Sequence, residues 1–306
     1  MPALLIALLL FSHVGTTSFS KATSKVVAGA SRAKYSLFLT VNGLIACFFF
    51  WLFGGFSVTA TRATLIFGAI YAVIVAASIL LNMAAYGMVS VTGVNVILNG
   101  CGLLCTSAMG ALLFGEELSI KNIIRILIML VAIALTFIDT KRRGGLAEKS
   151  EDSQKKAGKG KMARLVTVLV LIVAVSCANT VTLKYFTLAE GAADNNSFFF
   201  FTNVFLSAGC GMVLLFETVR RKGRIDEAAE IFKPRAILPI VGNTAASNIG
   251  SLVGVILLSQ IDVLVYTPIS SAVGIISGVV GSLIFKEKLS IYSYLAALVA
   301  LAAVII

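Results

Sequence analysis

The residues of this sequence that could do chemistry are polar side chains set inside otherwise apolar segments. An amide without a hydrogen-bond partner is costly in lipid, so each should face either a cavity or another helix. Hydrogen bonding between helices, worth about 0.6 kcal/mol on average, is the alternative for any single residue. As a group, we expect these residues to line a polar cavity. They are Asn42, Asn82, Tyr86, Asn95, Asn99, Asn179, Asn203, Asn243, Ser247, Asn248 and Tyr266.

The spacing of several of these residues places them on common helix faces. Asn95 and Asn99 are one turn apart, and Asn243, Ser247 and Ser251 form a similar stripe. Such a lining suits a neutral, zwitterionic or sugar-like solute. The candidate substrate-binding residues are Asn82, Tyr86, Asn95, Asn99, Asn179, Asn243, Ser247, Asn248 and Tyr266.

Two titratable residues have separate candidate roles. His13 is the single histidine and is near the centre of an apolar segment. Its ordinary pKa of about 6.5 would let it exchange protons near neutral pH, and the alternative is a neutral imidazole bonded to a neighbouring helix. Lys184 either extends to the membrane interface or attracts an anionic group at the outer mouth of the cavity.

The sequence lacks the residue sets that enzymes, metal or redox sites and ATP-driven transporters use. No cluster of His with carboxylates and no Ser/His/Asp set is visible, so we expect no enzyme. The five cysteines lack metal or redox spacing, and no metal or cofactor is predicted. No Walker motif is present, which argues against ATP-driven transport by this chain alone.

The composition explains how such residues could be positioned. Of 306 residues, 58% are hydrophobic and 13% charged, and a span needs about 20 apolar residues. The sequence predicts an all-α integral membrane protein of about ten transmembrane helices. Its basic residues lie in short loops, so nucleic-acid binding is not expected. The apolar segments are Ala3–Ser20, Tyr35–Phe53, Thr64–Met88, Val91–Phe114, Ile120–Ile138, Leu165–Leu188, Phe198–Phe216, Ile237–Leu258, Val263–Phe285 and Ser290–Ile306.

The two halves of the chain resemble each other. LFGEELSI at Leu113–Ile120 falls on IFKEKLSI at Ile284–Ile291 when the first half is shifted by 171 residues. A five-helix unit repeated in tandem must be inverted relative to its twin, which is the architecture of many secondary transporters with a central cavity. We predict repeats at residues 1–140 and 164–306, joined by a flexible, polar linker at 141–163.

Charge predicts the orientation in the membrane. Of the 25 Lys and Arg residues, 21 lie near the loops of one face and four near those of the other. By the positive-inside rule, the linker and the 220–235 loop are cytoplasmic, in a plasma or inner membrane, and both termini are outside.

The five-plus-five layout and two "G-x-L-x-F-x-E-x-L-S" stretches, Gly110–Ser119 and Gly281–Ser290, resemble the EamA-like branch of the drug/metabolite transporter superfamily. The resemblance covers essentially the whole chain. It implies transport or export of amino acids, metabolites, nucleotide sugars or drugs. Relatives commonly keep both termini inside, so the charge pattern here departs from theirs.

We therefore expect a secondary transporter, an exporter or exchanger, of a small polar metabolite such as an amino acid or related solute. The expected partners are this small molecule, the lipid bilayer and protons as a candidate coupling ion, with a homodimer left open. The alternatives are a nucleotide-sugar or phosphorylated-metabolite exchanger, which should carry more cationic cavity residues, and a non-transporting structural or assembly protein of the membrane.

Overall fold

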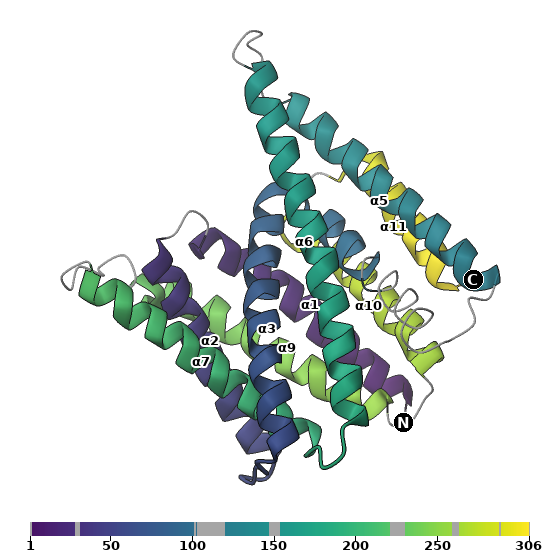
Figure 1. The fold of residues 1–306 in the computed structure, drawn as a ribbon. Coiled ribbons are helices and arrows are strands. Elements are labelled where there is room, and N and C mark those ends of the chain that lie inside the picture. The colour runs from purple at the N-terminus through teal and green to yellow at the C-terminus, as the bar shows by residue number, and fades with distance from the viewer. Residues whose placement is uncertain are drawn as a thin grey trace.

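A computed structural model describes residues 2–27, 31–100, 102, 120–146, 154–220, 230–258, 263–287 and 289–305. Within these ranges the chain is helical between short turns, and no strand occurs (Figure 1). The helices are α1 (Pro2–Val27), α2 (Arg32–Phe53), α3 (Arg62–Met88), an unlabelled helix Val91–Gly100, α5 (Ile120–Leu146), α6 (Gln154–Leu188), α7 (Asn195–Arg220), the 3-10 turn η1 (Glu230–Phe232), α9 (Pro234–Leu258), α10 (Val263–Ile284) and α11 (Ile291–Ile305).

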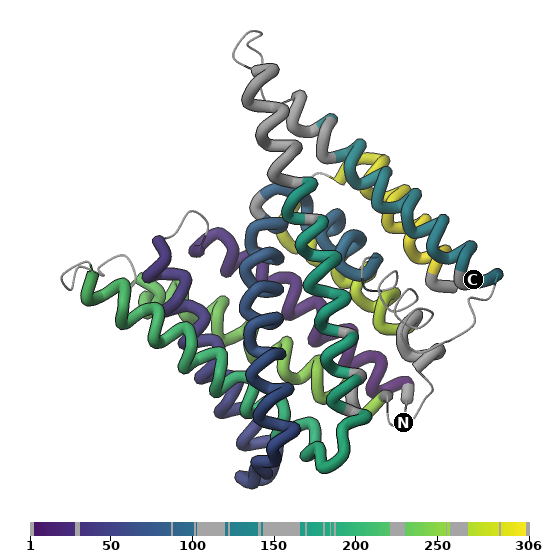
Figure 2. The backbone as a smooth tube through the Cα atoms, viewed as in Figure 1, coloured from purple at the N-terminus to yellow at the C-terminus, as the bar shows by residue number. Residues whose placement is uncertain are grey.

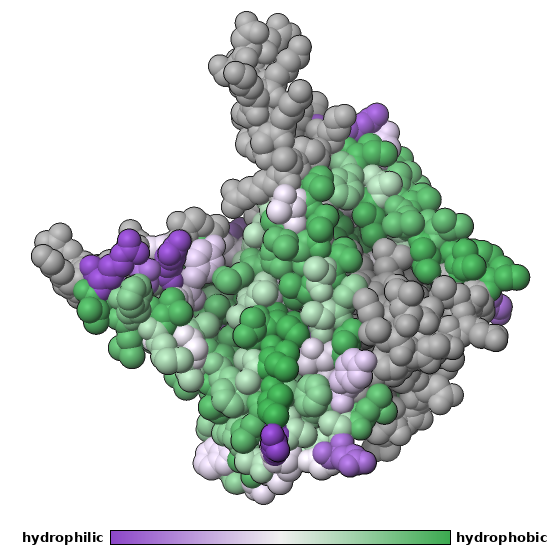
Figure 3. Space-filling model, in the orientation of Figure 1, coloured by the Kyte–Doolittle hydropathy of each residue, from purple (hydrophilic) through white to green (hydrophobic). Residues whose placement is uncertain are grey.

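Six of the described helices are long and apolar enough to cross a membrane, namely α1, α2, α3, α6, α7 and α9. Large apolar side chains cover their outer surfaces, and Val73 of α3 and Phe11 of α1 are 71% and 76% exposed. Figure 3 shows this broad hydrophobic surface, with hydrophilic residues towards its edges. An apolar exterior of this extent is what lipid-facing surface requires, so the fold is that of an all-α, membrane-embedded protein.

The helices pack in a small set of pairs. The α1 helix runs along α9 and α10, α2 along α7, and α3 against α6 and α7. The α5 and α11 helices form a further pair, side by side at one edge of the molecule (Figures 1 and 2). The α5–α11 pair joins the rest through Met129 and Ala300, which share a buried cluster with Val96 and Ile275.

The ends of the helices meet at two opposite faces. At the basic end, defined by Lys21 and Lys34, Lys34 Nζ lies 3.0 Å from the carboxylate of Glu230, which precedes α9. At the opposite end, defined by the α2–α3 and α6–α7 turns, the Thr59 backbone N–H donates to Ser197 Oγ over 2.9 Å. Consecutive helices α1, α2 and α3 therefore alternate in direction, as in a chain that crosses one layer repeatedly.

Glu287, in the turn after α10, ties three helices together at the basic end. Its carboxylate lies 3.5 Å from Lys21 Nζ and accepts hydrogen bonds from the Val91 N–H at 3.0 Å and Ser282 Oγ at 3.1 Å. Lys21 also donates to the Tyr86 carbonyl over 2.7 Å. A carboxylate at the first turn of helix Val91–Gly100 is favoured by the helix dipole, so Glu287 both caps that helix and binds α1 to it.

The described helices extend beyond the apolar segments predicted from sequence. The linker expected at residues 141–163 is helical at both ends, because α5 continues to Leu146 and α6 begins at Gln154, and residues 147–153 lie outside the described part. Lys, Gln and Ala favour helix in water as well as in lipid, so loss of hydrophobicity does not end a helix. The fourth predicted segment, Val91–Phe114, is described as helix to Gly100, and most of the remainder lies outside the described residues.

The GxxxG step of α10 brings two helices close together, as its small residues predict. A Cβ built on Gly278 would lie 2.6 Å from Asn95 Cβ, and one on Gly274 would lie against the Asn99 amide. Helix Val91–Gly100 therefore packs directly on the glycine face of α10.

We predict that Glu287→Ala lowers the free energy of unfolding by about 1–3 kcal/mol, because it leaves the Val91 N–H and Lys21 without their carboxylate. Glu190→Ala, at an exposed turn, is the matched control and should change it by less than about 0.5 kcal/mol. Thermal unfolding of the purified protein in detergent measures both. Equal midpoints for the two variants would show that the Glu287 contacts contribute no net stability.

Candidate functional site

A cavity of about 250 Å³ lies where α2, α3, α6, α7 and α9 meet. Most of its lining side chains carry an amide, a hydroxyl or an aromatic ring. Its lining consists of Asn42, Ala46, Phe50, Tyr71, Ile74, Val75, Ser78, Ile79, Asn82, Asn179, Phe199, Thr202, Asn203, Asn243, Thr244, Ser247, Asn248 and Ser251.

The cavity is near the middle of the helices that form it. On α3 the lining extends from Tyr71 to Asn82, well inside Arg62–Met88, and on α9 from Asn243 to Ser251, well inside Pro234–Leu258. The α3 positions recur at the three- and four-residue spacing of one helix face. The polar hollow is therefore distant from both ends of these helices.

Several lining amides are held by partners. Thr244 Oγ1 lies 2.5 Å from Asn42 Oδ1, which links α9 to α2. The Ser20 hydroxyl donates to Asn243 Oδ1 over 2.7 Å, linking α1 to α9. Asn203 Nδ2 donates to the Phe199 carbonyl one turn earlier, at 2.8 Å. These hydrogen bonds hold the three amides in place in the cavity wall, including the part of the wall nearest the basic end.

Three other lining residues carry buried polar atoms without a hydrogen-bond partner. They are the Asn179 carbonyl oxygen Oδ1, the Asn248 amide nitrogen Nδ2 and Thr202 Oγ1. Asn248 and Thr202 are 7% and 1% exposed. A buried polar group without a partner costs about 1–3 kcal/mol. Such groups gathered around one hollow are available to bind water or a polar solute.

Aromatic rings form one wall of the cavity. The Phe50 and Phe199 rings are stacked, with centroids 5.2 Å apart and an interplanar angle of 20°. Tyr71 contacts both Phe198 and Phe199, at 5.2 and 6.3 Å between centroids. These rings add a flat apolar surface to the polar lining.

No charged residue is present in the described lining. The nearest helix N-terminus, that of α7, is already occupied, because Asp194 accepts from the Ser197 N–H at 3.0 Å and from Ser197 Oγ at 2.8 Å. Partial burial of the Asp194 carboxyl works against its charged form, but these hydrogen bonds outweigh it and hold its pKa below the ordinary value. The described part of the lining is therefore polar but carries no charge.

Five of the nine candidate residues named from sequence lie together in this lining. They come from three helices, α3, α6 and α9, that are distant in the chain. The five are Asn82, Asn179, Asn243, Ser247 and Asn248.

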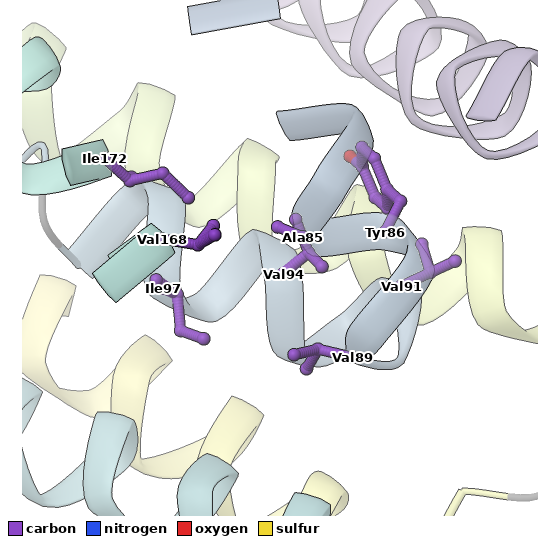
Figure 4. Packing of buried hydrophobic residues seen from close by; sticks show 8 residues of the cluster. All are labelled: Ala85, Tyr86, Val89, Val91, Val94, Ile97, Val168 and Ile172. Carbon is purple, nitrogen blue, oxygen red and sulfur yellow. The ribbon is translucent and has the colours of Figure 1, made fainter. Parts of the chain in front are cut away.

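Three further candidates lie elsewhere, in helix contacts. Asn95 Nδ2 donates to the Val91 carbonyl at 3.0 Å and Asn99 Nδ2 to the Asn95 carbonyl at 2.8 Å, so each amide nitrogen has a partner within its own helix, and both side chains pack on the glycines of α10. Tyr86 is 5% exposed and belongs to an apolar cluster with Val91 and Val168 (Figure 4). Close packing, rather than a hollow, accounts for the placement of these three.

The remaining candidates are not brought into the cavity by the described contacts. His13 is half-buried in α1 and is not part of the lining. Lys184 and Tyr266 lie on α6 and α10, and their side chains are outside the described part of the structure.

Sequence reasoning missed part of the site. Asn42 and Asn203 were among the polar residues expected as a group to line a cavity, and Ser251 was part of the predicted stripe, but none was among the nine candidate substrate-binding residues. Threonine and serine give a weaker signal, because their hydroxyls commonly bond to their own helix. The additional polar lining residues are Asn42, Tyr71, Ser78, Thr202, Asn203, Thr244 and Ser251.

Comparison with protein-family models and with curated proteins finds no match to this chain.

The free energy of unfolding should respond differently to the loss of an unpaired polar atom and to the loss of a bonded one in the lining. Asn248→Leu removes an unsatisfied amide, so we predict an unchanged or higher free energy of unfolding, by up to about 1 kcal/mol. Thr244→Val on the same helix leaves Asn42 Oδ1 unsatisfied and should lower it by about 1 kcal/mol. Thermal unfolding in detergent reads out both, and a larger loss for Asn248→Leu would mean that its amide has a structural partner.

Proposed function

We propose that this protein is a secondary carrier that moves a small polar solute across a membrane. The observation that carries the proposal is the polar cavity at mid-height, lined from five helices, with unsatisfied polar atoms inside an otherwise apolar molecule. Buried amides are tolerated in lipid where they line a wet pathway. The resemblance of the chain to EamA-like transporters agrees with this proposal.

The packing pairs support an inverted repeat of five helices. In such a repeat, α1 corresponds to α6, α2 to α7, α3 to α9, helix Val91–Gly100 to α10, and α5 to α11. The α1–α9 pair then corresponds to the α3–α6 pair, and α3–α7 to α2–α9, and all four pairs occur. The α2–α7 and α5–α11 pairs each correspond to themselves, as pairs on a twofold axis do.

Polar contacts between helices lie on the side of the cavity nearest the basic end. Ser20 bonds to Asn243, Thr244 to Asn42, and Lys21 to the Tyr86 carbonyl and Glu287. Farther from this end, the lining residue Ser247 is exposed. A carrier must open one side of its site while the other is shut, and these contacts are candidates for the closed side.

The alternatives are supported less well. A nucleotide-sugar or phosphorylated-metabolite exchanger would need cations to hold phosphate, and the described lining contains none. A structural or assembly protein has no need of unsatisfied polar atoms around a cavity. His13 stays a candidate for proton coupling, acting from α1 rather than from the described lining.

Filling the cavity should stop transport. We predict that Ser78→Trp, which adds an indole at the half-buried α3 wall, lowers transport at least about tenfold because the solute loses its site. Val73→Trp, on the exposed apolar face of the same helix, is the matched control and should retain activity. The assay uses proteoliposomes loaded with a cell metabolite extract, with mass spectrometry of the solutes that leave, with and without a pH gradient.

Release of no solute beyond that from protein-free liposomes would contradict a carrier. Equal release from both tryptophan variants would show that the solute does not pass through this cavity.

Labelling in intact cells tests the orientation given by charge. In a cysteine-free background, a membrane-impermeant maleimide should label Ser57→Cys, in the exposed α2–α3 turn, without permeabilisation. Ser150→Cys, in the basic stretch of sequence between α5 and α6, should react only after permeabilisation. The reverse pattern would place both termini inside, as is common among EamA-like transporters.

A further inference from the structure

We propose that the solute bound in this cavity is uncharged, such as a free sugar, a polyol or a nucleoside, and is not an amino-acid zwitterion or a phosphorylated compound. This inference rests on the proposed carrier function and narrows its substrate class. Three features of the described lining carry it: its lack of charge, its unsatisfied donors and acceptors, and its aromatic wall.

A charged solute would find no counter-charge here. No Asp, Glu, Lys, Arg or His is present among the described lining residues. A helix N-terminus can replace a cation in binding carboxylate or phosphate, but α2, α3, α6 and α9 pass the cavity in mid-helix, where the backbone N–H groups are already bonded. The N-terminus of α7 is capped by the protein's own carboxylate, Asp194.

A zwitterion would therefore lose the hydration of both its charges without gaining an ion pair for either. Burial of an unpaired charge is far more costly than burial of a hydroxyl or an amide that finds a partner. The cavity discriminates against charge by offering only neutral dipoles.

The unsatisfied atoms specify what the solute should offer. Asn248 Nδ2 requires an acceptor, Asn179 Oδ1 requires a donor, and Thr202 Oγ1 can serve as either. A solute with both donors and acceptors on a small frame satisfies all three. Sugar and polyol hydroxyls have this property, and so does the amide edge of a nucleobase.

Size and shape agree with such a solute. The cavity, at about 250 Å³, is smaller than the range of about 300–1,000 Å³ typical of drug-sized ligands, so a nucleotide sugar is too large for it. The Phe199 ring, half-buried at the wall and stacked on Phe50, can cover a flat apolar face of a sugar or base.

Charge selectivity can be measured before any solute is known. Ser78→Cys, a conservative change in the lining, is treated with three methanethiosulfonates of the same chemistry: neutral 2-hydroxyethyl, anionic sulfonatoethyl and cationic trimethylammonioethyl. Ser57→Cys in the exposed turn is the reference that corrects for intrinsic reactivity. Asn82→Cys, one turn further along α3, is a second lining site should Ser78→Cys fold poorly. The native cysteines replaced beforehand are Cys47, Cys101, Cys105, Cys177 and Cys210.

Relative to the reference, the neutral reagent should modify the cavity cysteine at least about tenfold faster than either charged reagent. A charged reagent that reacts as fast as the neutral one, after the same correction, would overturn the proposal.

Pairs of matched neutral and charged ligands then test the proposed substrate class separately from the proposed carrier function. Thermal shifts of the purified protein are compared for glucose against glucose 6-phosphate, inositol against gluconate, uridine against uridine monophosphate, and glutamine as a zwitterion. Stabilisation by a neutral member alone, lost in Ser78→Trp and kept in Val73→Trp, supports the proposal and identifies the source of the hydroxyl or amide groups. Stabilisation by glutamine or a phosphate ester would overturn it while leaving a carrier function intact.

Discussion

The need of every buried amide for a partner governs the arrangement of this molecule. In an apolar surrounding, an unpaired amide is costly, so several of the asparagines bond to their own helix or to a neighbour. Asn95, Asn99 and Asn203 donate to the carbonyl one turn earlier, and Asn42 lies within hydrogen-bond distance of Thr244. Asn179 and Asn248 keep an unpaired atom, and both line the same cavity. The cavity lining therefore combines amides that are held by partners, such as Asn42 and Asn203, with amides that keep an atom free to bind a solute.

Apolar segments alone predicted where the helices lie, because lipid selects for runs that are apolar on nearly all sides. Their ends were predicted less well. The α1 helix was expected to end near Ser20 but continues to Val27, since Lys21 and Ser24 find hydrogen-bond partners at the basic end while remaining helical. Hydropathy marks where a segment leaves the apolar layer, whereas the end of a helix depends on local capping and packing.

The candidate site could be predicted only in part, because an asparagine in an apolar segment looks the same whether it faces a hollow or a neighbouring helix. Asn82 and Asn99 both lie inside apolar segments, so the sequence does not distinguish them. Asn99 packs on Gly274 and bonds to its own backbone, and Asn82 lines the cavity. What separates them is the position of the partner helix, and that depends on residues distant in the chain.

A carrier of this kind requires a water-filled polar hollow at mid-height between the helices. Nitroxide scanning of α3 from Tyr71 to Asn82 in liposomes, with power saturation by a water-soluble nickel chelate and by oxygen, tests it most directly. If the cavity holds water, collisions with nickel should peak at the lining positions, including Tyr71, Ser78 and Asn82. Collisions with oxygen should peak at Val73 on the exposed face. Low nickel accessibility along the whole segment would mean that the amides are in dry contacts, and the carrier proposal would then fail.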